Sequence, residues 1–153
     1  MSRFTSADFA SLEDFSLLSR WTSEDHHVLP ADALASIQPL TPARAAQLAP
    51  EAAARCAERR VVDLELAISA EWDVPEPVRQ HLRETGVPHD TPVLVSWNSQ
   101  TAVLTRWDTF TQDWDAFCYP SSDDVTVWSP DGDWTLCYRH FQAIEFGRNR
   151  AAT

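Results

Sequence analysis

The sequence predicts an α+β fold in which N-terminal helices pack against a C-terminal antiparallel sheet, built as a hairpin, a helix and a second hairpin. Helical signals dominate residues 6–86, whereas residues 92–147 contain two pairs of β-rich segments joined by turn residues. A chain of 153 residues is large enough to bury a substantial core. We therefore expect one domain over 1–153, with a helical part at about 6–86 and a sheet part at about 92–147.

The N-terminal part contains several separate helix signals. Apolar residues three positions apart predict a first helix over 6–18, or a helical turn leading to Trp21: Phe9, Leu12, Phe15 and Leu18. Pro30 opens a short helical segment that ends before Pro39. Thr41 and Pro42 are a typical N-cap and first helical residue, and they begin an Ala-rich helix. Pro50 is expected to begin another helix that runs through Arg60.

The next segments are a helix and a stretch that fits two structures. Residues 61–72 alternate as a strand would, but their apolar residues also fit one face of a helix. Glu, Leu and Ala favour a helix, and no turn signal separates this stretch from Arg60, so we predict a helix here. Residues 75–85 predict a further helix with Val78 and Leu82 inward, followed by Gly86 at its C-terminal end.

The first hairpin and its helix are the clearest part of the pattern. Residues 93–97 and 102–106 are rich in β-branched residues and are separated by Asn98, Ser99 and Gln100, which favour a turn. From Trp107 onward the spacing of the aromatic residues is that of a helix, and Thr105 is its predicted N-cap. Its buried face contains Trp107, Phe110, Trp114 and Phe117, and its outer face Asp108, Gln112, Asp113 and Asp115.

The second hairpin follows a polar connector. Residues 125–129 and 134–140 are predicted strands, and residues 130–133 (Pro-Asp-Gly-Asp) predict the turn between them. Bulky side chains occur at both odd and even positions of the return strand. A strand of this composition is expected in the interior of a sheet or covered on both sides.

Charge is concentrated in the same region. The chain has a net charge of −11, and all twelve of its basic residues are Arg. Between Trp107 and Glu145 there are eight acidic residues and one base, Arg139, for a local net charge of −7. This composition disfavours binding to nucleic acid or an anionic membrane and favours a basic protein partner. No stretch approaches the roughly 20 apolar residues of a spanning helix.

The cysteines and the first residues of the sequence indicate the cellular compartment of the protein. Cys56, Cys118 and Cys137 are odd in number, widely spaced and without a CxxC motif, so we expect free, reduced, buried thiols. The first residues contain no long apolar run and show no signal peptide. Both observations predict a cytoplasmic protein.

Two clusters could be interpreted as chemical sites. The first combines carboxylates with an imidazole and could hold a metal ion, but its order matches no calcium loop, so acidic loop tips are the favoured interpretation: Asp123, Asp124, Asp131, Asp133 and His140. The second, Glu24-Asp25-His26-His27, lacks further zinc ligands and is interpreted as a solvated loop. The chain has no G-x-S-x-G motif and only three Gly, so we expect neither catalysis nor a cofactor.

The tryptophans suggest a binding surface. Trp97, Trp128 and Trp134 lie at predicted strand ends, where part of each ring is expected to be exposed. Aromatic rings flanked by carboxylates are typical of an interface with a basic partner, although core packing is an equally good interpretation for any single ring. The predicted partner-binding residues are Asp123, Asp124, Trp128, Asp131, Asp133 and Trp134.

Three sequence runs between residues 92 and 148 carry a family resemblance: Trp114–Val125, Asp133–Gln142 and Glu145–Gly147. They resemble small bacterial immunity proteins encoded beside polymorphic or secreted toxins, including the SUKH group. The resemblance implies an acidic, non-catalytic α+β protein that blocks a cognate toxin by covering its active site or an adjoining surface. Two alternatives stay open: a small metal-dependent hydrolase using the Asp123–His140 cluster, and a general protein-interaction domain.

Overall fold

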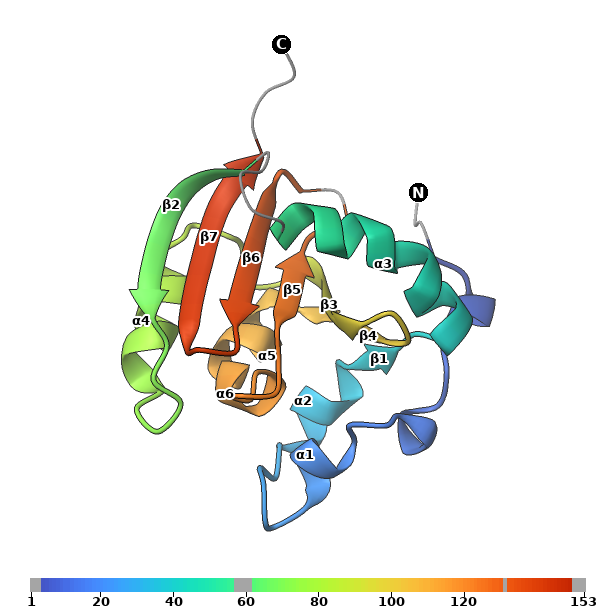
Figure 1. The fold of residues 1–153 in the computed structure, drawn as a ribbon. Helices are drawn as coiled ribbons and strands as arrows, with labels where there is room; N and C mark the ends of the chain where they lie inside the picture. The colour runs from blue at the N-terminus through green and yellow to red at the C-terminus, as the bar shows by residue number, and fades with distance from the viewer. Residues whose placement is uncertain (1–3, 57–61, 131, 150–153) are drawn as a thin grey trace.

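The computed structural model describes residues 4–56, 62–130 and 132–149. Its centre is a seven-stranded sheet with the strand order β1-β4-β3-β5-β6-β7-β2, in which every neighbouring pair is antiparallel (Figure 1). The predicted α+β class is confirmed. The strands are β1 (Gln38–Pro39), β2 (Val62–Ser69), β3 (Pro92–Asn98), β4 (Thr101–Arg106), β5 (Val125–Trp128), β6 (Trp134–Arg139) and β7 (Ala143–Asn149).

Helices cover both faces of the sheet. The longest, α3, packs on one face, and α4, α5 and α6 pack on the other (Figure 1). The helices are α1 (Ser19–Thr22), α2 (Ala31–Ala35), α3 (Pro42–Cys56), α4 (Glu76–Arg83), α5 (Trp107–Gln112) and α6 (Trp114–Phe117). Two 3-10 turns, Ser6–Asp8 and Leu12–Asp14, precede α1.

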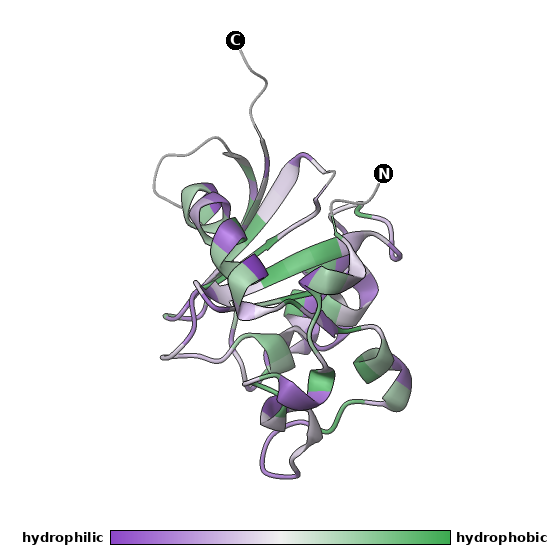
Figure 2. Cartoon of the chain, turned by 90° about the vertical axis from the view of Figure 1, so that its right-hand side faces the viewer, coloured by the Kyte–Doolittle hydropathy of each residue, from purple (hydrophilic) through white to green (hydrophobic). Residues whose placement is uncertain are grey.

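The alternation of side chains along the strands divides the core in two. In β3, Val93 and Val95 belong to the larger cluster under α4–α6, whereas Leu94 packs with Leu48 of α3 and with Trp128. The central strands are accordingly hydrophobic, with more hydrophilic helix surfaces outside them (Figure 2). Strands covered on both faces explain why both sides of the predicted return strand carry bulky residues.

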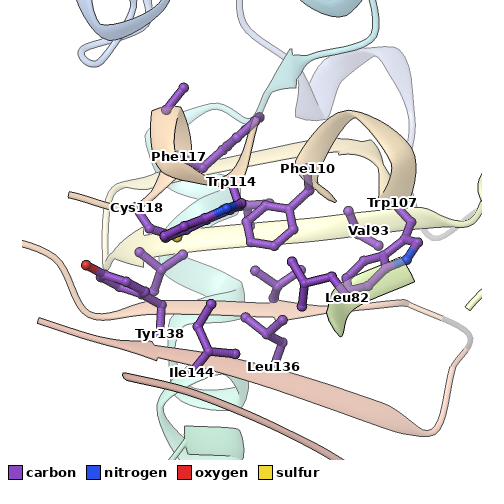
Figure 3. Packing of buried hydrophobic residues seen from close by; sticks show 14 of the residues in the cluster. Leu82, Val93, Trp107, Phe110, Trp114, Phe117, Cys118, Leu136, Tyr138 and Ile144 are labelled. Atoms are coloured by element: carbon purple, nitrogen blue, oxygen red, sulfur yellow. The ribbon is translucent and has the colours of Figure 1, made fainter. Parts of the chain in front are cut away.

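Most of the predicted C-terminal pattern is confirmed. β3 and β4 form the first hairpin, and β5 and β6 form the second. The four aromatic residues of the predicted helical face are all buried, and Figure 3 shows Trp107, Phe110 and Trp114 lying against the sheet. The helix itself is interrupted at Asp113, and α5 begins after Arg106, one residue later than the predicted cap. Asp115, which we expected on the outside, is buried.

The prediction of a helix over residues 61–72 is wrong, because β2 runs through it as a strand. β2 pairs with β7, which the sequence pattern did not reveal. In this pairing Leu66 lies opposite Phe146 and Ile68 opposite Ile144, so the apolar residues of β2 complete the larger core. The free energy of this long-range packing outweighs the weak local helix propensity of the segment.

The N-terminal helices differ from expectation in two places. Residues 6–18 form two 3-10 turns and not one helix. α3 continues through Pro50, where the sequence predicted a new start. Its N-terminus is as predicted, since the Arg44 backbone N–H donates to Thr41 Oγ1 at 3.2 Å. α4 buries Val78 and Leu82, and Gly86 follows it with a φ of 86°.

The prediction of three free thiols is also wrong. Cys56 at the end of α3 and Cys137 in β6 form a disulfide, and Cys118 is free and buried. The two bonded cysteines are 81 residues apart, so their proximity depends on α3 packing across the sheet. Within the described ranges, no helix has the length and apolar character needed to cross a membrane.

Candidate functional site

The predicted acidic cluster is not assembled in the structure. Because β5 and β6 are antiparallel, residues that precede β5 lie near those that follow β6, and the intervening turn lies at the other end of the hairpin. Asp124 accepts from His140 Nδ1 at 3.0 Å at one end. Asp133 faces Arg148 at 3.5 Å at the opposite end. Asp131 lies outside the described residues. In the described part of the chain, no group of three or more His, Cys, Asp or Glu side chains is placed to hold a metal ion.

Three of the six predicted partner-binding residues are buried. Trp128 is 0% exposed and Trp134 is 3% exposed, so the expectation of partly exposed rings is wrong for both. Trp128 packs under α3, and Trp134 packs edge-on against Trp107. Asp123 is buried and ion-paired with Arg20. Only Asp124 and Asp133 of the six predicted residues are exposed in the described chain.

Most acids of this region form ion pairs, and two of them, Asp115 and Asp123, pair with arginines that are distant in sequence. Of the eight acids between Trp107 and Glu145, seven lie in the described chain, and only Asp113 has no ion pair there. Five of the other six face an Arg and one faces a His: Asp108 with Arg106, Asp115 with Arg79, Asp123 with Arg20, Asp133 with Arg148, Glu145 with Arg139, and Asp124 with His140. The predicted acidic face is therefore mostly a set of ion pairs.

A different surface forms where four loops meet, on the lower side of Figure 1. The loops are residues 23–29, 70–75, 119–124 and 140–142. The Trp72 backbone N–H donates to Gln142 Oε1 at 3.0 Å, and the Ser121 N–H donates to the carbonyl of His140 at 2.9 Å. The His27 ring lies edge-on to Trp72, with centroids 5.6 Å apart. These contacts join segments from both halves of the chain.

Two residues with buried carboxylates, Asp115 and Asp123, fix the positions of these loops. Asp115 Oδ2 lies 3.2 Å from His27 Nε2, and the Asp115 carbonyl accepts from Trp72 Nε1 at 2.6 Å. Asp123 binds the guanidinium of Arg20 through both oxygens and accepts from the Tyr119 backbone N–H at 2.9 Å. Burying a carboxylate is costly unless it is paired and hydrogen-bonded, and both of these are.

The pKa shifts in this region follow from burial and neighbours. Partial burial, and then the Asp115 carboxylate, raise the pKa of Asp113 above its usual value. For Asp124, partial burial acts to raise the pKa, but hydrogen bonds from the His140 backbone and ring outweigh it, so the pKa is lowered. Asp124 is therefore an anion held by the loop that contains His140.

The meeting loops expose apolar groups. Four large hydrophobic side chains are exposed in the described chain, and three of them belong to these loops: Val28 at 65%, Val74 at 51% and Phe141 at 67%. The half-buried rings of Trp72 and Tyr119 lie between the loops, 5.6 Å apart. Exposed apolar groups gathered around aromatic rings are typical of an interaction site.

Four acids without an ion pair in the described chain lie on two of the same loops. Glu24, Asp25, Glu71 and Asp73 are exposed, and their carboxylates form no ion pair within the described residues. We call this region the loop surface. It consists of Glu24, Asp25, Val28, Glu71, Trp72, Asp73, Val74, Tyr119, Asp124 and Phe141.

The sequence contained part of the signal for this surface. Glu24 and Asp25 belong to the run interpreted as a solvated loop, and Trp72 is flanked by Glu71 and Asp73 just before a Pro. The placement of Trp72 in a helix hid this signal. Neither segment indicated that it would meet the other.

A cleft of about 590 Å³ lies elsewhere, beside residues 86–89. Asp108 and Thr111 are among its lining residues, and Asp108 Oδ1 and Thr111 Oγ1 have no hydrogen-bond partner within the described chain. Both atoms are enclosed by protein, however, so a molecule in the cleft would not reach them. The loop surface is the stronger candidate.

Comparison of the chain with protein-family models, with curated proteins and with solved structures finds no match.

Proposed function

We propose that this protein is a non-catalytic binding protein of the bacterial immunity type, which neutralises a cognate toxin by covering a basic surface of that toxin. The observation that supports the proposal is the composition of the loop surface, where exposed apolar groups and half-buried aromatic rings share loops with four carboxylates that form no ion pair within the described residues. Of the six residues that the sequence predicted for partner binding, only Asp124 belongs to this surface.

Each component of the surface has a physical role in the proposed complex. Trp and Tyr are enriched among residues whose truncation weakens binding, because their large rings bury area with few rotatable bonds. Unpaired carboxylates attract a basic partner over a distance and raise the association rate. Asp115 and Asp123 hold the loops in one arrangement, so that little conformational entropy is lost on binding.

The compartment is a separate question from the mode of binding. The sequence favoured the cytoplasm, whereas a Cys56–Cys137 disulfide favours an oxidising compartment. The proposed activity requires only that the protein meets the toxin, and it holds in either location.

Growth rescue tests the proposal directly. The protein encoded next to this gene is expressed in a bacterial host, alone and together with the wild-type chain. We expect the neighbour to stop growth and the wild-type chain to restore it. A loop variant with four charge reversals should not restore growth: Glu24→Arg, Asp25→Arg, Glu71→Arg and Asp73→Arg.

The control variant has the same change in net charge at four exposed acids outside the loop surface: Glu13→Arg, Asp14→Arg, Glu84→Arg and Asp90→Arg. It should restore growth as the wild type does. Surface binding kinetics of the purified pair should show association that slows as salt rises from 0.1 to 1 M, because the Debye length falls from about 10 Å to about 3 Å. A neighbour that is harmless, or a loop variant that protects fully, would contradict the proposal.

A further inference from the structure

The two edges of the sheet differ in how they are protected. At one edge, β1 has only two residues, and the N-terminal segment covers it through a bridge between Phe9 and Leu40 and a bond from the Ala10 N–H to the carbonyl of Pro39. At the other edge, β2 has eight residues and, in the described chain, pairs only with β7 (Figure 1). A long edge strand with free backbone groups can pair with another chain.

The register identifies which backbone groups of β2 are free. Ala70 N–H donates to the carbonyl of Gln142 at 2.8 Å. In an antiparallel pair, inward- and outward-directed N–H groups alternate along the strand. The N–H groups of Ile68 and Ala70 therefore point toward β7, and those of Ala67 and Ser69 point away from the sheet.

In the part of the chain that the structure describes, the sheet face beside this edge is also open. α3 packs on β3 to β6 and leaves β7 and β2 outside its cover (Figure 1). Small side chains there, Ala67, Ser69 and Ala143, leave a groove of about 300 Å³ that is bounded by Phe141 and by the Arg139–Glu145 ion pair. Leu64, the fourth exposed large hydrophobic side chain of the described residues, lies on the same strand.

We propose that β2 accepts an extended segment of the protein partner as an added strand, and that this segment alternates basic with large apolar residues. The inference rests on the proposed binding function and specifies how the partner docks. β2 ends at Ser69, and the chain enters the loop surface two residues later, so an added strand and the loop surface form one continuous interface.

The chemistry of the edge selects this occupant. Glu71 and Asp73 follow β2 and form no ion pair within the described residues, whereas the exposed Glu65 of β2 pairs with Arg148 at 3.2 Å. Basic side chains on the added strand would therefore meet unpaired carboxylates where β2 enters the loop surface. A net charge of −11 disfavours a second copy of this chain. The backbone bonds to Ala67 and Ser69 would supply affinity, and the groove would select a large apolar side chain, as is general when a peptide extends a sheet.

Proline substitution tests the edge without the native partner. Ala67→Pro removes an outward N–H and leaves the bonds to β7 intact, and Pro is tolerated at such edge positions. Ala67→Ser keeps the N–H and is the matched control. A displayed library of linear ten-residue peptides is selected against the wild-type protein. We expect alternating basic and apolar peptides that bind wild type and Ala67→Ser, and that bind Ala67→Pro at least tenfold more weakly.

Thermal melting must first show that Ala67→Pro is folded, and Ser69→Pro provides a second variant if it is not. Amide hydrogen exchange gives a readout that does not depend on substitution. The selected peptide should slow exchange at Ala67 and Ser69 at least tenfold, while Ile68 is already protected in the free protein. The absence of any selected peptide, equal binding by the proline variants, or protection only at other segments would overturn the proposal.

Two further outcomes separate this inference from the proposed function. If Ala67→Pro restores growth as wild type does while the loop variant fails, the immunity function stands and strand addition is wrong. If peptides protect Ala67 but the neighbouring protein is not neutralised, the strand site stands and the immunity function is wrong. A dimer in light scattering that Ala67→Pro converts to a monomer would assign the edge to a second copy and overturn the basic-segment proposal.

Discussion

Arg20 and Asp123 are 103 positions apart in the chain, yet the guanidinium of Arg20 binds both carboxylate oxygens of Asp123, at 2.6 and 3.2 Å. The same guanidinium lies over the Tyr119 ring, 4.0 Å from its centre. This pair joins α1 to the segment that precedes β5. It converts a residue that the sequence suggested as partner-binding into an internal support for the loop surface.

Loss of Arg20 should be strongly destabilising. Arg20→Ala leaves the buried Asp123 carboxylate without its counter-ion, which typically costs about 3–5 kcal/mol. Chemical denaturation measures the change in the free energy of unfolding. The double variant Arg20→Ala with Asp123→Ala should lose less than the single variant, since it leaves no unpaired charge. A double variant that is worse than Arg20→Ala would contradict this account.

Trp114→Ala should lower the free energy of unfolding by roughly 3–5 kcal/mol, as for other large aromatic core residues reduced to Ala. The Trp114 ring is fully buried, and its Nε1–H donates to the carbonyl of Pro75 at 3.1 Å. Denaturant titration gives the value. Val28→Ala, at an exposed position, is the control and should change stability by less than about 0.5 kcal/mol. An unchanged midpoint for Trp114→Ala would place this aromatic face in solvent.

The Cys56–Cys137 disulfide leaves one thiol to count. Titration of denatured, unreduced protein should find only Cys118, and none in Cys118→Ala. Replacing Cys56 and Cys137 with Ser should lower the free energy of unfolding by roughly 4.5 kcal/mol, the loop-closure value for a separation of 81 residues. A count of three thiols would restore the interpretation drawn from the sequence and support a reducing compartment.

Asp113→Asn should stabilise the protein at pH 7 and have no effect below about pH 3.8. Burial, and then Asp115, raise the pKa of Asp113, so the folded state holds this proton more tightly than the unfolded state. Ionisation at neutral pH therefore costs stability, and an Asn avoids that cost. Below the unfolded pKa the carboxyl is protonated in both states, and the difference disappears. Thermal unfolding across pH 3 to 7 measures it.

Asp124→Asn is the matched comparison with the opposite sign. The net lowering of the Asp124 pKa means that its charged form stabilises the folded state above the unfolded pKa, and this contribution is lost as pH falls through the folded pKa. Asp124→Asn should therefore be less stable than wild type at pH 7. If both variants shifted stability in the same direction at pH 7, the assignment of these two pKa shifts would be wrong.

The features that could be predicted from the sequence are local. Turn residues and β-branched runs defined both hairpins, the spacing of Trp107, Phe110, Trp114 and Phe117 defined a buried face, and Thr41 marked the start of α3. Each depends on interactions within a few residues, such as a cap or the period of one element. Such interactions are readable from a single segment.

Which segments contact one another could be seen only in the folded chain. Residues 62–69 form a strand because they pair with β7, where Leu66 and Ile68 have cross-strand partners. Cys56 forms a disulfide with Cys137, and several carboxylates of the C-terminal half form ion pairs with arginines of other elements. Burial and ion pairing depend on neighbours that the whole fold brings together. The residue pattern of a single segment does not indicate which neighbours these are. For that physical reason the exposed acidic and aromatic residues of the loop surface come from four separate loops, and no single stretch of sequence could place them together.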